Sequence, residues 1–138
     1  MTGKRILLLI MGLGLIGTAI GYFLWNKPHE NMTTSKAEAT VEASALFQSY
    51  NTDENAANGK YLGKTIAVTG KVKETSKAEG SPSKITLETG DEFGVICELD
   101  ALSQHSRTDF TAGETVTFKG KCDGINLDVQ LSRCVEVK

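Results

Sequence analysis

The feature that most constrains this chain is an uncharged apolar run near its beginning, Ile6–Trp25. As a helix, these 20 residues would extend roughly 30 Å, which is the thickness of the hydrocarbon core of a bilayer. Lys4 and Arg5 precede the run, and positive residues favour the cytoplasmic side of a membrane. The sequence therefore predicts a single-pass anchor over residues 6–25, with residues 1–5 in the cytoplasm and the remaining chain outside it.

Three glycines inside this run, Gly12, Gly14 and Gly17, form the G-x-G-x-x-G pattern of dinucleotide-binding folds. Such folds also need a polar-faced helix after the glycines and an acidic residue about 20 positions later, at the end of a second strand. Here the residues after Gly17 remain apolar, and the first acidic residue, Glu30, follows Pro28 in a polar segment. The pattern therefore favours a membrane segment that contains glycines.

A cleaved signal peptide is the main alternative to an anchor. The run is long for a signal peptide, and it ends with the aromatic residues Tyr22, Phe23 and Trp25. The first pair of small residues that resembles a cleavage site, Ala37 and Ala39, is distant, and no cysteine near the end of the run predicts a lipid. We favour the uncleaved anchor. Both interpretations place the domain that follows outside the cytoplasm.

The charge of the chain beyond the apolar run argues against a polyanionic ligand. All 17 acidic residues lie after Pro28, where they outnumber the basic ones. Domains that hold a phosphate backbone are usually basic, because each contact to a phosphate releases counterions. This part of the chain has the opposite balance.

The segments that follow the anchor predict a linker and a helical lead-in. Residues 26–36 are polar and suit a flexible tether. Within 37–62, apolar residues recur at helical spacing at Ala39, Ala43, Leu46, Phe47 and Tyr50. Asp53 is placed to cap a second short helix that carries Ala56, Ala57 and Tyr61.

From residue 63 onwards, the pattern predicts a small β-barrel. Alternating apolar residues indicate five strands, near 64–73, 84–88, 93–99, 116–122 and 127–137. A helix is expected over 101–110, a hairpin turn at Asp123-Gly124, and an irregularity at Ser132-Arg133 in the last strand. The order β-β-β-α-β-β is that of the five-stranded OB-fold barrel. Gly70 and Gly120 interrupt apolar positions, as expected where strands bend to close a barrel.

Several short segments of the region 39–138 resemble the tRNA_anti-like family of bacterial exported OB-fold proteins. They run from Asn58 to Val72, from Gly113 to Val116, from Gly120 to Gly124 and from Asp128 to Cys134. The resemblance implies an N-terminal helical lead-in, an OB barrel, and export or attachment to a membrane. It implies no catalytic residues, and it does not establish nucleic-acid binding.

The sequence predicts no cofactor, no metal site and no catalytic constellation, and therefore not an enzyme. His29 lies in the linker and His105 in the predicted helix, so they do not have the spacing of metal ligands. The cysteines form no C-x-x-C pair, and no nucleophile motif is present.

Cys97, Cys122 and Cys134 have three alternative fates in an oxidising compartment. The resemblance includes Cys122 and Cys134 together and so implies that pair, although a tight turn at 123–126 would separate them by about 20 Å, beyond bridging distance. Barrel closure places the third and fifth strands side by side and so allows Cys97–Cys134. Free buried thiols are the third alternative.

The outer face of the first three strands is the predicted binding surface, because OB-folds present ligands there. The residues expected to point outward are Thr69, Lys71, Lys73, Lys84, Thr86, Glu88, Ile96 and Glu98. Single-strand binders combine a basic groove with stacking aromatics, whereas these charges are mixed and the nearest aromatic, Phe93, has core parity. The sequence thus predicts a membrane-tethered extracytoplasmic module for an envelope protein, peptide or glycan. The alternative is an OB-fold protein that binds single-stranded DNA or RNA.

Overall fold

The computed structural model describes residues 3–26 and 31–137 of the chain. The middle of the predicted linker, including Pro28, His29 and Glu30, lies outside these ranges, as do both chain ends. The chain divides into two compact units, one over Met1–Glu30 and the other over Asn31–Lys138.

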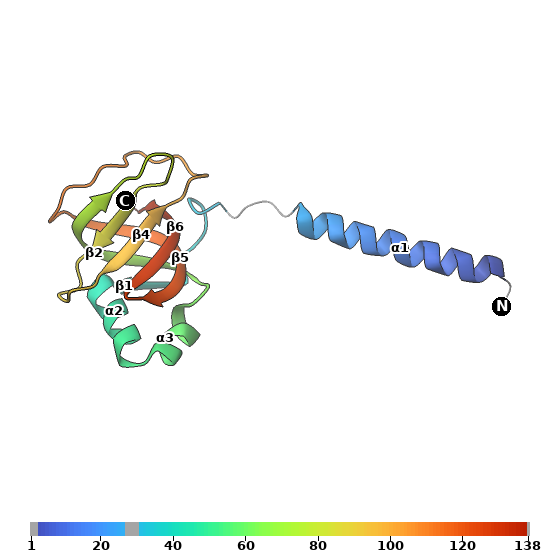
Figure 1. Ribbon diagram of the computed structural model, residues 1–138, viewed down its shortest axis with the longest axis horizontal. Helices are drawn as coiled ribbons and strands as arrows, with labels where there is room; N and C mark the ends of the chain where they lie inside the picture. The colour runs from blue at the N-terminus through green and yellow to red at the C-terminus, as the bar shows by residue number, and fades with distance from the viewer. Residues whose placement is uncertain (1–2, 27–30, 138) are drawn as a thin grey trace. The chain divides into compact units, whose positions relative to one another are not determined.

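The first unit is a helix, α1 (Gly3–Trp25), as the apolar run predicts (Figure 1). None of its residues is buried, and beyond Lys4 and Arg5 it carries no charged residue. Within the described ranges it is the one helix long and apolar enough to cross a membrane, a test that a signal sequence also passes. The chain therefore has an N-terminal apolar helix of the signal or anchor type.

The second unit is a five-stranded mixed barrel of the OB type with one added strand (Figure 1). The barrel strands are β2 (Thr65–Ser76), β3 (Lys84–Leu87), β4 (Val95–Leu99), β5 (Thr115–Asn126) and β6 (Asp128–Glu136). Their order in the sheet is β2-β3-β4-β6-β5, and pairing of β2 with β5 closes the barrel. The β4–β6 pair is parallel and the other barrel pairs are antiparallel.

The core of the barrel consists of the inward residues of the alternating strands. The β5 residues Val116, Phe118 and Cys122 are buried, while their outward neighbours are partly or fully exposed. Phe118 and Ile85 of β3 are fully buried, and Leu131 of β6 is almost fully buried. Burying each such side chain stabilises the fold by about 1.5–3 kcal/mol, which explains why two-residue periodicity located these strands correctly.

The two glycines expected at bends lie where strands and helices approach closely. β2 pairs with β5 as far as Lys71 and with β3 from Val72 onward, so the strand changes partner just after Gly70. A Cβ at Gly70 would lie 2.9 Å from the Cβ of Ala43. At Gly120, which lies at a register shift between β5 and β6, a Cβ would overlap the Sγ of Cys134. Both positions exclude a side chain.

The helical lead-in begins with a strand, β1 (Ala39–Glu42), and not with a helix as predicted. This segment contains the β-branched residues Thr40 and Val41, and it pairs in parallel with β2. Two helices follow, α2 (Ala43–Thr52) and α3 (Glu54–Tyr61), and Asp53 caps α3 through Ala56, as predicted. Both helices lie at one end of the barrel, which we call the helical end (Figure 1).

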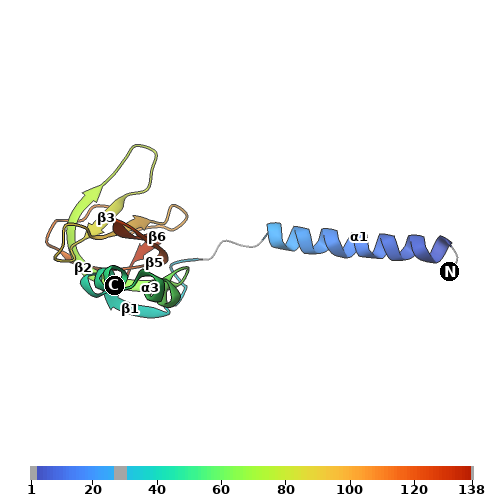
Figure 2. The ribbon, with the colours of Figure 1, turned by 60° about the horizontal axis from the view of Figure 1, so that its bottom comes forward.

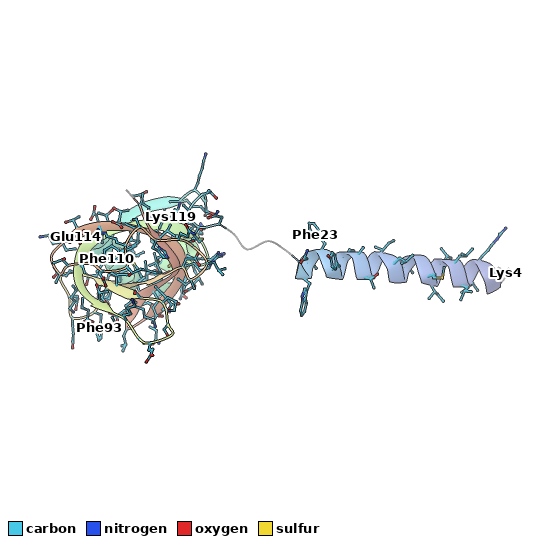
Figure 3. All side chains as sticks on the ribbon, turned by 90° about the horizontal axis from the view of Figure 1, so that it is seen from above. Lys4, Phe23, Phe93, Phe110, Glu114 and Lys119 are labelled. Carbon is cyan, nitrogen blue, oxygen red and sulfur yellow. The ribbon has the colours of Figure 1, made fainter. Side chains whose placement is uncertain are left out.

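The predicted helix over 101–110 is wrong, because this segment is an irregular loop between β4 and β5. Leu102 is 68% exposed, so the segment has no apolar stripe to pack. Asp100 accepts a hydrogen bond from the backbone N–H of Leu102, a local bond that competes with helix formation. Phe110 packs edge-on against Phe118 at a centroid distance of 5.2 Å and lies over the barrel in the view from above (Figure 3).

The hairpin turn between β5 and β6 is three residues later than predicted. Strand pairing continues through Asn126 and Asp128, and Leu127 forms the turn with a φ of 65°. The Asp123-Gly124 pair instead accompanies a register shift within β5, where Gly124 adopts a φ of 95° close to Leu62. The predicted irregularity in β6 is present, because Arg133 has a φ of 54° at a second register shift.

The last part of the predicted linker packs on the barrel and is not a free tether. Met32 is fully buried, and the carbonyl of Thr33 accepts a hydrogen bond from Lys119 Nζ on β5 at 3.2 Å. The compact barrel unit therefore begins at Asn31, before the lead-in starts.

Candidate binding face and loop cleft

Four of the predicted surface residues lie together on adjacent strands. Lys84 faces Glu98 and Thr86 faces Ile96 across the β3–β4 ladder. The same surface continues onto β2 through Glu74 and Ser76 and onto β6 through Gln130. We call this set the β3–β4 face: Glu74, Ser76, Lys84, Thr86, Ile96, Glu98 and Gln130.

Lys84, the one cation of the β3–β4 face, pairs with one of the two carboxylates of that face. Lys84 Nζ lies 3.5 Å from Glu98 Oε2, and both side chains are well exposed to solvent. An exposed pair of this kind contributes at most about 1 kcal/mol, so either side chain can exchange its partner for a ligand at little cost. The face thus offers one cation, two carboxylates, short hydroxyls and the apolar Ile96.

The other four predicted residues lie elsewhere, and two of them, Thr69 and Lys71, do so because that part of β2 pairs with β5. Thr69 faces Thr117, and their hydroxyls are 2.8 Å apart. Thr69, Lys71 and Glu88 line a separate hollow of about 350 Å³ near the start of α2. Lys73 lies at the register shift of β2, where its Nζ donates to the carbonyl of Glu92.

A larger hollow lies at the end of the barrel opposite the helices. We call it the loop cleft; it has a volume of about 690 Å³. One wall is the β2–β3 loop, residues 77–83, which projects beyond the barrel in Figure 2. The other wall is made by Leu99, Asp100, Ala101, Ser103, His105 and Thr108. The sequence prediction missed this cleft because it assigned the second wall to a helix.

A buried carboxylate organises the second wall of the loop cleft. Asp100 is 4% exposed, and its carboxylate accepts hydrogen bonds from Ser103 Oγ at 2.5 Å and from the N–H of Leu102 at 3.3 Å. It also pairs with Arg133 Nε at 3.6 Å. Burial alone would raise the pKa of Asp100, but the bonds from Ser103 and Leu102 and the charge of Arg133 lower it below its ordinary value.

The wall is not arranged for nucleophilic catalysis. Ser103 donates to the Asp100 carboxylate, whereas His105 Nε2 lies 2.7 Å from the backbone carbonyl of Asp100. A serine nucleophile needs a base within hydrogen-bond reach. Here Ser103 bonds to the Asp100 carboxylate and His105 to the Asp100 carbonyl, so the two side chains do not bond to each other. Over residues 3–26 and 31–137, no three or more His, Cys, Asp or Glu side chains gather so as to hold a metal ion.

An ion cluster fastens the rest of the 100–114 loop to the end of β6. The Arg107 guanidinium bonds to Glu136 at 2.8 and 3.1 Å, binds Glu114, and lies 4.4 Å from the Phe110 ring centroid. The hydrogen bond from Arg107 lowers the pKa of Glu114. In the view from above, Glu114 lies at the rim of the barrel and Phe110 nearer its centre (Figure 3). The loop therefore has a defined conformation without a helix.

The barrel unit presents few of the side chains that stack on bases. Each aromatic residue between 31 and 137 packs in the hydrophobic core or against it: Phe47, Tyr50, Tyr61, Phe93, Phe110 and Phe118. Several basic side chains are paired with carboxylates of the same domain, among them Lys84, Arg107 and Arg133. Among residues 31–137, the aromatic side chains therefore serve the core, whereas OB-folds that hold single strands use exposed aromatic platforms.

Comparisons with known proteins agree with the fold. The crystal structure of a protein described as a "putative nucleic acid-binding lipoprotein" from Klebsiella pneumoniae subsp. pneumoniae MGH 78578 superposes with a TM-score of 0.53. It has 19% sequence identity, and the match covers 71% of this chain and 91% of that one. At this identity the likeness shows the fold alone. No curated protein matches the chain. The model of the tRNA_anti-like family matches residues 1–136, nearly the whole chain, and the chain therefore belongs to the tRNA_anti-like family of OB-fold proteins.

Proposed function

We propose that this protein is a membrane-attached extracytoplasmic binding module that holds a polypeptide partner on its β3–β4 face and in its loop cleft. One observation carries the proposal: the two surfaces adjoin at the ends of β3 and β4. Ser83 and Leu99 line the cleft. Their neighbours in the chain, Lys84 and Glu98, form the ion pair of the β3–β4 face. A ligand that contacts both surfaces must cross the edge of the barrel at this pair.

The chemistry of the surface suits a polypeptide. Protein-binding surfaces combine apolar contacts with satisfied polar groups and exchangeable charges. The β3–β4 face has Ile96 between Thr86 and Gln130, and the loop cleft adds a concave pocket of a size that encloses a side chain or a short segment. No catalytic family is indicated by the comparisons, which supports a binding role.

Site-specific photo-crosslinking in cells tests this surface. A photo-reactive amino acid at Thr86 should give discrete protein adducts in envelope fractions, whereas one at Gln48, exposed on α2, should give none. Ile96→Arg should abolish the Thr86 adducts, and Lys60→Glu on α3 should leave them intact. Equal adducts from both positions, or adducts that survive Ile96→Arg, would contradict the proposal.

The proposed location rests on α1, which is long and apolar enough to span a bilayer and carries Lys4 and Arg5 in its first turn. Cells that express the full chain with an epitope at each end provide the test. Protease added outside the inner membrane should degrade the C-terminal epitope and spare the N-terminal one, and carbonate washing should leave the protein in the membrane. Protection of the C-terminal epitope in intact spheroplasts would overturn the orientation.

Nucleic-acid binding is the second candidate, and the description of the Klebsiella protein is the observation that favours it. It would require the Lys84 ammonium to leave Glu98 for a phosphate. Fluorescence anisotropy with a labelled single-stranded oligonucleotide at low salt distinguishes the two candidates. We expect no saturable binding. Salt-dependent binding that Lys84→Glu removes would make nucleic acid the ligand of the β3–β4 face.

A further inference from the structure

The three cysteines are free thiols, all buried in the barrel core, and the structure separates them into a pair and a single residue. The Cys122 Sγ lies 3.3 Å from the hydroxyl oxygen of Tyr50 on α2, so its partner is at the helical end. Cys97 on β4 and Cys134 on β6 instead lie near each other on adjacent strands, and both are fully buried.

Strand pairing explains why Cys97 and Cys134 are neighbours. In the parallel β4–β6 ladder, Cys97 faces Leu131 and Leu99 faces Cys134, with a register shift between these pairs. The two cysteines therefore lie diagonally across adjacent strands, and both side chains point into the core. On the other side of Cys134 is Gly120 of β5, whose missing side chain leaves the space that the Cys134 sulfur occupies.

We propose that Cys97 and Cys134 form a disulfide between β4 and β6, and that Cys122 remains a thiol beside Tyr50. The inference rests on the proposed extracytoplasmic location, because disulfides persist in oxidising compartments. It also decides between two pairings that the sequence leaves open. Because the hairpin turns at Leu127, Cys122 lies opposite Leu131 and is closer to Cys134 than a turn at 123–126 would place it. The Cys122 thiol nevertheless bonds to the Tyr50 hydroxyl.

The bond forms by thiol–disulfide exchange with an external disulfide oxidant. One cysteine thiolate attacks a sulfur of the oxidant, forms a mixed disulfide and releases one oxidant thiol. The second cysteine thiolate then displaces the other oxidant sulfur and forms the Cys97–Cys134 bond. In total, two protein thiols are oxidised and the oxidant disulfide is reduced to two thiols.

The burial of the pair determines when this exchange takes place. Burial raises the pKa of the Cys134 thiol, so little thiolate is available in the folded barrel, and an oxidant cannot approach a residue at 0% exposure. The exchange therefore precedes the docking of β6 onto β4. A barrel that folds fully reduced keeps both thiols, and oxidant added afterwards reacts with them slowly.

Refolding of the full-length protein tests the pairing without reference to its location in the cell. The reduced chain is unfolded in detergent and denaturant, refolded in a reduced and oxidised glutathione buffer, alkylated under denaturing conditions and mapped by mass spectrometry. We expect one alkylated cysteine, Cys122, and a peptide pair linked through Cys97 and Cys134. Cys122→Ser should leave this link unchanged, and Cys97→Ser should leave both remaining cysteines alkylated.

Two results would overturn the proposal: three alkylated cysteines after oxidative refolding, or a bond that includes Cys122. If Cys97→Ser fails to fold, Cys97→Ala, which preserves an apolar side chain, replaces it. Alkylation of freshly acid-trapped cells then separates the two proposals. A bond that forms on refolding but is absent from trapped cells supports the pairing and counts against the extracytoplasmic location. A bond found in both supports the pairing and the location together.

Discussion

Replacing one glycine by alanine should have opposite effects at two positions of this protein. At Gly120, the added Cβ would overlap the Cys134 Sγ and lie 2.9 Å from the carbonyl oxygen of Ser132 and 3.3 Å from the Cα of Cys134. Two of these three atoms belong to the backbone of β6, which pairs with both β4 and β5 and so cannot move away easily. At Gly59, within α3, a Cβ would meet nothing within 4 Å.

The magnitudes follow from these surroundings. Overpacking a core costs about 1–3 kcal/mol, and the rigid neighbours of Gly120 place Gly120→Ala in the upper half of this range. For a domain of about 100 residues, a loss of roughly 2–3 kcal/mol lowers the Tm by about 10–20 °C. Gly59→Ala should instead stabilise the protein by about 0.5–1 kcal/mol, because alanine loses less backbone entropy than glycine in a helix.

Pulse proteolysis in urea measures these changes on the full-length protein in mild detergent under reducing conditions. It reports unfolding of the barrel, whereas tryptophan fluorescence would report α1, which holds the single tryptophan, Trp25. The double variant Gly120→Ala/Cys134→Ala removes the overlapping sulfur and should recover part of the loss, with a coupling of about 0.5–2 kcal/mol. A loss at Gly120 of less than about 0.5 kcal/mol, which is the usual error of additivity, or no coupling with position 134 would refute the reasoning.

Three further variants test the polar contacts. Asp100→Asn should destabilise the protein by about 1–3 kcal/mol at pH 7. Because the folded pKa of Asp100 lies below its ordinary value, the stability advantage of the wild type is complete above the ordinary carboxyl pKa and is lost as the pH falls through the folded pKa. The urea midpoints of the two proteins should therefore differ at pH 7 and converge in acid, and a difference that does not depend on pH would contradict the role of the carboxylate. Arg107→Met should raise the pKa of Glu114 toward its ordinary value in a carbon-detected NMR titration, and an unchanged Glu114 titration would contradict the role of Arg107. Tyr50→Phe should lower the free energy of unfolding in urea by about 0.5–1.5 kcal/mol, because it removes the hydrogen bond to Cys122. In a Cys122→Ala background this bond is already absent, so the same substitution should have no effect.

The predicted binding residues show that a sequence pattern predicts which side chains point outward on a strand, but not which strands share a surface. Alternation identified the outward residues of β3 and β4 correctly, and four of them lie together on the β3–β4 face. Thr69 and Lys71 were grouped with them because they share the parity of one strand. The strand changes partner from β5 to β3 after Lys71, so its two parts belong to different surfaces of a closed barrel.

The loop cleft was missed for a different physical reason. A helix of this length is only marginally stable in water, and most helical stability in proteins comes from packing an apolar face. Residues 101–110 have no such face. Hydrogen bonds that the Leu102 N–H and the Ser103 hydroxyl donate to the Asp100 carboxylate organise the chain as a loop instead. The turn chemistry of Asp100 and Ser103, three residues apart, was the signal available in the sequence.

The sequence by itself determined those features that depend on neighbouring residues: the apolar helix α1, the cap at Asp53, and the barrel strands with their inward side chains. Periodicity suffices there because each side chain is buried or exposed according to its place in a local repeat. Only the tertiary structure decided which segments meet: β1 against β2, the turn at Leu127, and Cys134 beside Cys97. These contacts depend on how a barrel closes, which is a property of distant strands and not of any single stretch of sequence.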